Sequence, residues 1–368
     1  MSGDDARWMR TALGLGARGQ GRVWPNPAVG CVIVQQGRIV GRGWTQPGGR
    51  PHAEPEALRQ AGPAAKGATV YVTLEPCAHT GKTPPCADAL VAADVARVVI
   101  ACTDSDPRVS GKGIAILQAA GISVDVGVLA HEARADHMGF FLRINAGRPM
   151  VSLKLASSFD GRIATATGES QWITAPPARR AVHAMRSRHD AVMVGGGTAR
   201  QDDPSLTVRD LGVTRQPTRI VVSNGLDIPL GGALAKTAGD IPLILCHGSK
   251  APTELIEAWK SLGATLIACA SRMGQIDADD MLQQLGQHGL TRIFCEGGGG
   301  LAATLLQAGL VDQLIGFTAG LTLGADGLPA IAALQLRHLA QAPRFTLTET
   351  ARIGPDLLHI WARADAPA

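Results

Sequence analysis

The chain has 368 residues, enough for two or three domains that each bury their own core. Its net charge of +4, its scattered basic residues and its aromatic content of 4% argue against a nucleic-acid partner. No apolar stretch reaches the roughly 18 residues of a membrane-spanning helix, the polar first residues do not form a signal peptide, and the seven cysteines lack the spacing of a disulfide framework. We therefore expect a globular, cytoplasmic protein without membrane contact.

The first elements predicted in chain order are a helix over residues 5–18 and a hairpin of strands 31–34 and 38–44. Asn26 lies between two prolines where the first strand begins. Its amide could bind a ring carbonyl or a sugar hydroxyl of a ligand, or it could simply form the turn. The spacing does not separate these two roles.

Three potential metal ligands follow. His52 begins a predicted helix, and Cys77 follows a predicted strand, nine residues before Cys86. One imidazole and two thiols leave a fourth coordination position for water, as in catalytic zinc sites, whereas a structural site would be closed by a fourth protein ligand. Glu54, two residues after His52, could reach that water without being a ligand. His-x-Glu followed by Pro-Cys and a second Cys is typical of zinc nucleobase deaminases, and this coincidence favours a zinc site over three ordinary buried residues.

The predicted chemistry is hydrolytic deamination. Zn²⁺ lowers the pKa of a water bound to it and so supplies a nucleophile near neutral pH. Glu54 would take a proton from this water and pass it to the ring nitrogen and the leaving ammonia. Eight residues separate the two cysteines, where the common deaminase pattern has two, and the longer loop carries His79 and Lys82.

The rest of the first half alternates strands and helices, which predicts an α/β layer with a mainly parallel sheet. The expected elements are a helix at 89–93, a strand at 95–101, a loop at 104–113, a helix at 114–120, a strand at 122–128 and a helix at 130–144. Gly and Pro residues at 145–149 indicate a domain boundary. We expect one domain at residues 1–146 and another at 147–368.

The second half is predicted to be α/β as well. Its expected elements are a strand at 150–156, a helix up to residue 188 capped by Thr174, strands at 189–194, 219–223, 243–246, 264–268 and 292–295, and a helix at 301–308. Glycines follow the strand 189–194 and, after Glu296, the strand 292–295. Glycines between a strand and a helix can bring backbone amides onto a phosphate, so two such places favour a nucleotide cofactor. They do not form the G-x-G-x-x-G fingerprint.

The motifs of the first half resemble the deaminase half of the bifunctional riboflavin-biosynthesis deaminase–reductases. P-N-P-x-V-G, H-A-E and T-L-E-P-C-x-H-x-G-x-T-P-P-C stand here at 25–30, 52–54 and 73–86. The resemblance implies a cytidine-deaminase-like α/β/α domain acting on a ribosylaminopyrimidine 5′-phosphate, with His79 and Lys82 as phosphate contacts. These two could instead be a solvated surface pair. The family's D-P-N-P is Asp104-Ser105-Asp106-Pro107 here, so no contact is carried over from the missing Asn.

The second half resembles the reductase half of the same family, whose fold is like that of dihydrofolate reductase. The matching stretches are 154–155, 158–164, 168–174, 202–204, 206–209 and 296–298. The resemblance implies that NADPH reduces the ribosyl group to a ribityl chain, with Lys154 and Glu296 polarising or protonating the opening sugar. Residues expected at the substrate are Ser170, Arg186, Leu206, Arg209 and Glu296. Residues expected at NADP are Ala156, Trp172, Thr198, Asp202, Gly298, Gly299, Gly300, Leu301, Ala302, Ala303 and Thr304.

Several alternatives stay open. Arg186 and Arg209 could clamp the 5′-phosphate, because a guanidinium matches phosphate bidentately, or Arg186 could be a charge on a helix surface. The second half could bind nucleotide or mediate assembly without catalysis, although intact Lys154, Asp202 and Glu296 favour activity. A nucleic-acid deaminase would share the zinc site, but the composition disfavours it. The family implies NADP, which the residues alone do not separate from NAD, and we also expect a homo-oligomer.

Overall fold

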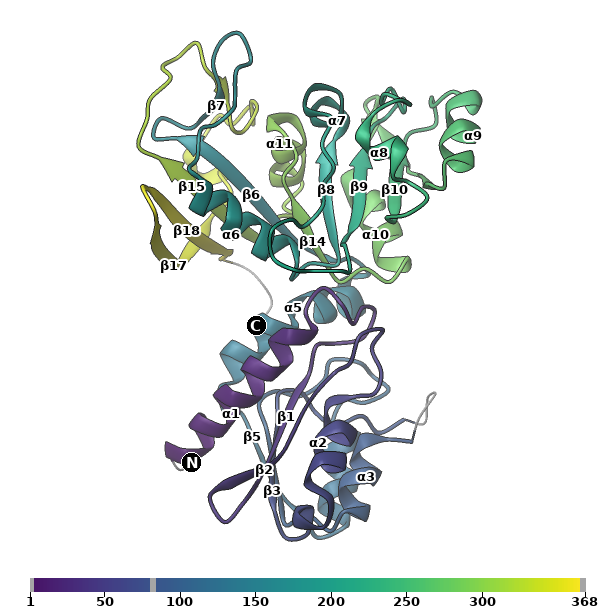
Figure 1. Ribbon diagram of the computed structural model, residues 1–368, viewed down its shortest axis with the longest axis vertical. Helices are drawn as coiled ribbons and strands as arrows, with labels where there is room; N and C mark the ends of the chain where they lie inside the picture. Colours follow the sequence, from purple (N-terminus) through teal and green to yellow (C-terminus); the bar gives the residue numbers. More distant parts are fainter. Residues whose placement is uncertain (1–2, 80–83, 365–368) are drawn as a thin grey trace. The chain divides into compact units, whose positions relative to one another are not determined.

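The computed structural model describes residues 3–79 and 84–364 and divides into two compact units, one up to Gly147 and one from Arg148 onward (Figure 1). Each unit has a sheet of its own flanked by helices. The α/β class predicted for both halves is therefore confirmed. No helix in the described ranges is both long and apolar enough to cross a membrane.

The sheet of the first unit is mixed. Its helices are α1 (Gly3–Gly16), α2 (Ala53–Ala61), α3 (Cys86–Ala92), α4 (Lys112–Ala119) and α5 (Ala130–Ala146), and its strands are β1 (Gly30–Gln35), β2 (Arg38–Trp44), β3 (Thr69–Val72), β4 (Arg97–Ile100) and β5 (Ser123–Val126). The strand order is β2-β1-β3-β4-β5. Because β1 pairs in antiparallel with both β2 and β3, only the β3–β4 and β4–β5 pairs are parallel. The expectation of a mainly parallel sheet was wrong here.

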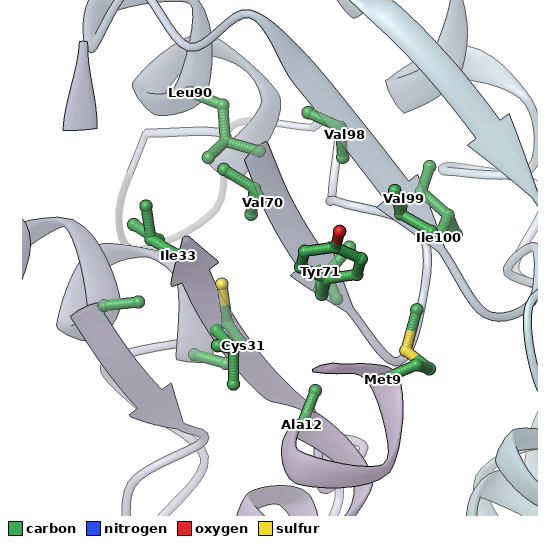
Figure 2. Packing of buried hydrophobic residues seen from close by; sticks show 14 of the residues in the cluster. Met9, Ala12, Cys31, Ile33, Val70, Tyr71, Leu90, Val98, Val99 and Ile100 are labelled. Atoms are coloured by element: carbon green, nitrogen blue, oxygen red, sulfur yellow. The ribbon is translucent and has the colours of Figure 1, made fainter. Parts of the chain in front are cut away.

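The core of this unit lies between α1 and the inner strands. Met9 and Ala12 stand three residues apart on one face of α1 and are fully buried. They pack toward Cys31 of β1 and Tyr71 of β3, with Val99 of β4 close by (Figure 2). Burying such a continuous set of apolar side chains is the main favourable contribution to folding.

Two glycines on β2 let α2 approach the sheet closely. A Cβ at Gly43 would lie 2.0 Å from the carbonyl oxygen of Ala53, and a Cβ at Gly41 would lie 2.2 Å from that of Ala57. Any side chain there would therefore push the helix away. This contact fixes the start of α2, where His52 is the N-cap residue and Glu54 lies in the first turn.

A buried carboxylate ties α1 to the sheet. Asp5 is 2% exposed and accepts hydrogen bonds from the Tyr71 hydroxyl at 2.9 Å and from the Arg97 guanidinium at 2.9 and 3.1 Å. Asp5→Ala should lower the free energy of unfolding of this unit by about 3 kcal/mol, because the buried Tyr71 hydroxyl loses its acceptor and the half-buried Arg97, which still pairs with Asp125, loses a bidentate partner. Hydrogen exchange of the amides in β3 measures this change.

A matched control is Asp94→Asn, because Asp94 has φ +54° and asparagine tolerates this left-handed conformation. Asp94 pairs with Lys66, and both side chains are more than 70% exposed, so its loss should change the same quantity by less than about 1 kcal/mol. Equal effects of the two variants would contradict the assigned role of Asp5.

The second unit is built on a nine-stranded sheet, with strand order β11-β10-β9-β8-β14-β6-β15-β18-β17. Its helices are α6 (Pro176–Arg186), α7 (Gly196–Asp202), α8 (Ala233–Lys236), α9 (Thr253–Ser261), α10 (Ala278–Gln287) and α11 (Gly299–Gln307). Its strands are β6 (Met150–Ser158), β7 (Arg162–Ala164), β8 (Ala191–Gly195), β9 (Thr218–Val222), β10 (Leu243–His247), β11 (Thr265–Ala268), β12 (Ser271–Arg272), β13 (Gln275–Ile276), β14 (Arg292–Cys295), β15 (Gln313–Ala319), β16 (Leu328–Pro329), β17 (Phe345–Ile353) and β18 (Asp356–Arg363).

Three neighbouring strands of this sheet, β8, β14 and β6, run parallel. Their carboxyl ends therefore meet at one edge, where glycines follow β8 directly and follow β14 after Glu296. In open α/β sheets such an edge is the usual place for a ligand.

The predicted cap of α6 was wrong. Ala175, not Thr174, is the N-cap residue, and the backbone N–H of Ala175 donates to Asp356 of β18 at 2.8 Å. The helix begins with Pro176 and Pro177, which need no hydrogen-bond acceptor of their own. A carboxylate distant in sequence thus accepts an amide at the start of this helix, which has no side-chain cap of its own.

Candidate active sites

Three potential metal ligands from different parts of the first unit converge. His52 immediately precedes α2, Cys77 follows β3, and Cys86 is the first residue of α3. The Nδ1 atom of His52 lies 3.3 Å from Sγ of Cys86 and 3.6 Å from Sγ of Cys77, and the three ligand atoms lie within 4.8 Å of one another. One imidazole and two thiols suit zinc and leave a coordination position for water.

The two thiols differ in proton affinity. Hydrogen bonding from Cys86 lowers the pKa of the Cys77 thiol well below its usual value, and the backbone N–H of Cys86 also donates to Sγ of Cys77 at 3.3 Å. Hydrogen bonding to Cys77, together with burial, raises the pKa of Cys86. The surroundings of Cys77 thus favour its thiolate, which is the form that binds a metal.

Glu54 lies in the first turn of α2 and is 3% exposed. Burial raises the pKa of its carboxyl group, and His52 opposes this rise. Glu54, His52 and Cys77 all line a cavity of about 480 Å³. A carboxylate beside a three-ligand metal site can take a proton from water and return it to a leaving group.

Asn26 and His79 line the same cavity. Nδ2 of Asn26 donates to the carbonyl oxygen of Gly49 at 3.0 Å, so this side chain both shapes the turn and faces the cavity. Gly49 has φ +85°, and a Cβ there would lie 2.0 Å from that Nδ2 atom. Nδ1 of His79 is buried without a hydrogen-bond partner in the described part of the chain, which suits a ligand contact. Lys82 lies outside the described residues.

Sequence reasoning missed the acidic residues of this cavity. Glu75 is 3% exposed and accepts four backbone N–H groups of residues 104–114 at 3.0–3.4 Å. It thereby fixes the loop that carries Asp104 and Asp106 into the cavity. Burial raises the pKa of Asp104 to about 6. Hydrogen bonding from Arg108 lowers the pKa of Asp106, which stands where the resembled family has Asn.

Two cavities of the second unit share part of their lining. One has a volume of about 530 Å³ and contacts the glycines after β8 and β14, and the other, of about 590 Å³, contacts α6. Lys154, Ala156, Ile163, Ser170 and Glu296 line both. Ligands in the two cavities would therefore meet at these five residues.

Glu296 is held by a guanidinium at this junction. Nε of Arg186 donates to Oε1 of Glu296 at 2.5 Å and Nη2 donates to Oε2 at 3.0 Å, and both side chains are 12% exposed. Burial favours the neutral acid, but the charges of Arg186 and Lys154 outweigh it and keep the pKa of Glu296 below its usual value. Burial lowers the pKa of Lys154, and Glu296 opposes this.

Most residues predicted to contact the cofactor line the 530 Å³ cavity: Ala156, Thr198, Asp202, Gly298, Gly299, Gly300 and Leu301. Trp172 lines the other cavity, and the Arg179 guanidinium lies 4.4 Å from the centre of its ring. Ala302 and Ala303 are buried in α11, and Thr304 donates to the Gly300 carbonyl within that helix. These last three residues are not part of either cavity lining.

The 590 Å³ cavity contains the predicted substrate residues Ser170, Arg186, Arg209 and Glu296. Leu206 is 2% exposed and belongs to the hydrophobic core, with φ +54°. Arg179, Arg180 and His183 of α6 also line this cavity and were not foreseen. The helical spacing of residues 179, 183 and 186 was a signal for one basic helix face.

Comparisons with known proteins decide the family. The model of the cytidine and deoxycytidylate deaminase zinc-binding region matches residues 2–102, and that of the RibD C-terminal domain matches residues 149–359. The chain is 42% identical to riboflavin biosynthesis protein RibD of Escherichia coli, over 97% of this chain and 99% of that protein. It is 38% identical to the Aquifex aeolicus protein of the same name, over 98% of each. The chain belongs to the RibD family.

Solved structures of RibD proteins agree with this family. Form 1 of Acinetobacter baumannii RibD has a TM-score of 0.86 at 38% identity, over 98% of this chain and 99% of that chain. A Thermotoga maritima diaminohydroxyphosphoribosylaminopyrimidine deaminase/5-amino-6-(5-phosphoribosylamino)uracil reductase has a TM-score of 0.85 at 31% identity, with the same coverage.

Membership of the RibD family confirms the predicted enzyme class. The chain is a bifunctional enzyme of riboflavin biosynthesis, a zinc deaminase and a reductase that uses NADPH. The cytidine-deaminase-like first domain and the RibD reductase second domain were predicted correctly. The donor set of the first unit fits zinc, and the glycine-lined cavity of the second unit fits a nucleotide phosphate.

Cys86→Ala should abolish zinc binding under conditions that load the wild-type protein. Loss of an outer partner of a metal ligand already weakens metal binding by about 10- to 100-fold, so loss of a ligand should do more. Zinc content after gel filtration checks this result, and ammonia release should fall with it. Cys269→Ala, which removes a thiol of the second unit, is the control. Full zinc retention by Cys86→Ala would refute the assignment.

Proposed function

We propose that this RibD-family enzyme deaminates 2,5-diamino-6-ribosylamino-4(3H)-pyrimidinone 5′-phosphate and then reduces the ribosyl group, giving 5-amino-6-ribitylamino-uracil 5′-phosphate. We place the first reaction in the unit up to Gly147 and the second in the unit from Arg148 onward. The main support is the presence of two separate reactive clusters in one chain. One is the three-ligand metal site beside Glu54, and the other is the junction at Lys154 and Glu296.

In the proposed deamination, His52, Cys77 and Cys86 hold the metal, which supplies an activated water when bound. Glu54 removes a proton from this water as its oxygen forms a bond to the ring carbon that carries the amino group, and it passes this proton to the ring nitrogen that receives the electron pair of the carbon–nitrogen double bond. Glu54 then moves the second proton of that oxygen to the amino group, the exocyclic carbon–nitrogen bond breaks, and ammonia leaves as the carbonyl forms. We propose Asn26, His79 and Lys82 as substrate contacts, the first two because they line the cavity.

In the proposed reduction, the sugar lies in the 590 Å³ cavity and NADPH, which supplies a hydride, in the 530 Å³ cavity. The C1′–O4′ bond of the ribosyl group breaks, C1′ receives the hydride, and O4′ takes a proton. Lys154 is the proposed proton donor, because it lines both cavities. Ser170 and Arg209 are proposed substrate contacts, as they line the same cavity.

We also propose a homo-oligomer in the cytoplasm. All seven cysteines are free thiols, which suits a reducing compartment. Strand β17 ends the nine-stranded sheet and has mostly exposed side chains, so its outer edge could pair with a second copy of the chain. Light scattering of the purified protein tests the oligomer, and a monomer at micromolar concentration would contradict it.

The decisive experiment follows two signals from the purified protein given the diamino substrate: ammonia release and NADPH oxidation. Both should appear, and a zinc chelator should stop both, because the reductase then receives no deaminated substrate. Adding the deaminated compound should restore NADPH oxidation despite the chelator. If ammonia appears but NADPH is never oxidised, the second unit only binds nucleotide or mediates assembly.

A further inference from the structure

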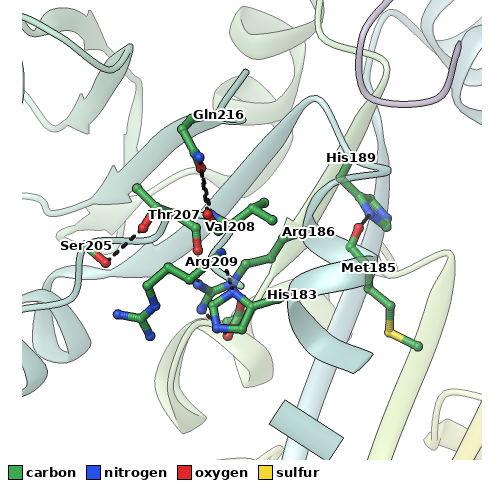
Figure 3. A network of polar contacts seen from close by, with 10 residues as sticks. His183, Met185, Arg186, His189, Ser205, Thr207, Val208, Arg209 and Gln216 are labelled. Atoms are coloured by element: carbon green, nitrogen blue, oxygen red, sulfur yellow. Dashed lines mark hydrogen bonds and ion pairs between the residues drawn. The ribbon is translucent and has the colours of Figure 1, made fainter. Parts of the chain in front are cut away.

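We propose that Arg108 binds the 5′-phosphate of the substrate in the deaminase cavity of the first unit. This inference deepens the deamination proposed above and rests on it. The product of that reaction is the substrate of the reductase, so both units have to accommodate the same phosphate. Arg186 and Arg209 line the 590 Å³ cavity of the second unit as predicted phosphate contacts (Figure 3). A guanidinium is a suitable partner for the same group in the first unit.

Arg108 lines the 480 Å³ cavity together with His52 and Cys77 of the metal site. It belongs to the loop between β4 and α4. The buried carboxylate of Glu75 holds this loop at both ends, because it accepts the backbone N–H groups of Asp104 at 3.3 Å and of Gly111 at 3.1 Å. Arg108 is therefore presented to the cavity by a fixed segment, which lowers the entropy that a ligand contact costs.

Asp106 orients the guanidinium of Arg108. Nε and Nη2 of Arg108 donate to Oδ2 of Asp106 at 3.0 and 2.5 Å, and the backbone N–H of Arg108 donates to Oδ1 at 2.9 Å. Both N–H groups of Nη1 and one of Nη2 are left without an acceptor in the part of the chain that the structure describes. The Arg108 side chain is 67% exposed, so these groups can bind a phosphate while the pair with Asp106 stays intact.

The charges of the cavity favour an anion at this place. Asp106 is buried, and its carboxylate would repel a phosphate if Arg108 did not compensate its charge. Arg108 and, to a smaller extent, His79 keep the pKa of Asp106 below its usual value, so both side chains lie close to this carboxylate. Nδ1 of His79 is buried without a hydrogen-bond partner among the described residues. Arg108 and His79 together thus offer unused nitrogen atoms on one wall of the cavity.

Arg108→Gln tests the inference through ammonia release from two compounds, the phosphorylated diamino substrate and its dephosphorylated counterpart with a free 5′-hydroxyl. For the phosphorylated compound we expect KM to rise by about 10-fold, the usual effect of losing a hydrogen bond between charged groups. Its kcat should stay within about threefold of wild type, because the contact is made equally in the bound substrate and in the transition state. The dephosphorylated compound should react as with the wild type. Arg108→Lys keeps the charge without the fork geometry and should recover part of the loss.

Inorganic phosphate gives a second measurement, which decides the matter if the dephosphorylated compound is not turned over. It should compete with the substrate of the wild-type deaminase, and Arg108→Gln should raise its inhibition constant. The matched control is Arg59→Gln, which removes an exposed arginine of α2 that pairs with Glu56 and does not line the cavity. This control should change neither KM nor the inhibition constant.

Three results separate the possible errors. Equal losses for the two compounds in Arg108→Gln would show that Arg108 only stabilises its loop, and this would overturn the inference. An unchanged KM in Arg108→Gln would also overturn it, and a raised KM in Arg50→Gln would then assign the phosphate to the other arginine of the cavity. Zinc content reports that the first unit of each variant is folded. A wild-type protein that releases no ammonia from the diamino substrate would instead refute the proposed function.

Discussion

Glu54→Gln should lower the rate of ammonia release by about 10²- to 10⁴-fold, the usual contribution of a positioned acid–base group. Glutamine preserves the size of the side chain but cannot carry a proton from water to the leaving amine. Zinc should stay bound, because Glu54 is not among the three converging ligands. Metal content and ammonia release, measured on the same sample, check both statements.

The matched control is Glu56→Gln in the same turn of α2. Glu56 forms an ion pair with Arg59 at 2.9 Å on the helix surface, and it does not line the cavity. Its loss should leave ammonia release within about twofold of wild type, since exposed ion pairs contribute little. Normal turnover in Glu54→Gln would remove the acid–base role from this residue.

What could be predicted from the sequence depended on how local the signal was. His52, Glu54, Cys77 and Cys86 were found because their chemical types and short spacings already specify a metal site. The glycines after β8 and β14 were found because glycines between a predicted strand and a predicted helix are also a local pattern. The sequence could not show that these two strands are neighbours, and that adjacency is what brings the glycines together.

The residues that were missed act over long separations in sequence. Glu75 binds backbone groups 29 to 39 residues away. Because every residue except proline has a backbone N–H, the sequence does not show which of these groups a carboxylate binds. Arg186 and Glu296 lie 110 positions apart. Their charges were noted separately, but only the fold could show that they neutralise each other. The cap of α6 failed as a prediction because its acceptor, Asp356, comes from β18.

Lys154→Met should lower NADPH oxidation by about 10³-fold, because methionine matches the length of lysine but has no proton to give. The wild-type rate should also have a basic limb below pH 10.5, the usual pKa of lysine, since burial lowers the pKa of Lys154. On the basic side of that limb Lys154 is neutral and the sugar oxygen loses its proton donor. In Lys154→Met the limb should be absent from the residual rate.

The proposed sites of the two reactions lie in different units, so ammonia release is an internal control for this prediction. Ammonia release by Lys154→Met should equal that of the wild type, because Lys154 belongs only to the second unit. NADPH binding, followed by fluorescence, should also persist, since the glycines after β8 and β14 are unchanged. Lys236→Met, which removes an exposed lysine from α8, controls for loss of positive charge. If Lys154→Met kept both its rate and its basic limb, the proton would have to come from another donor, and Glu296, shared by both cavities, would be the next residue to test.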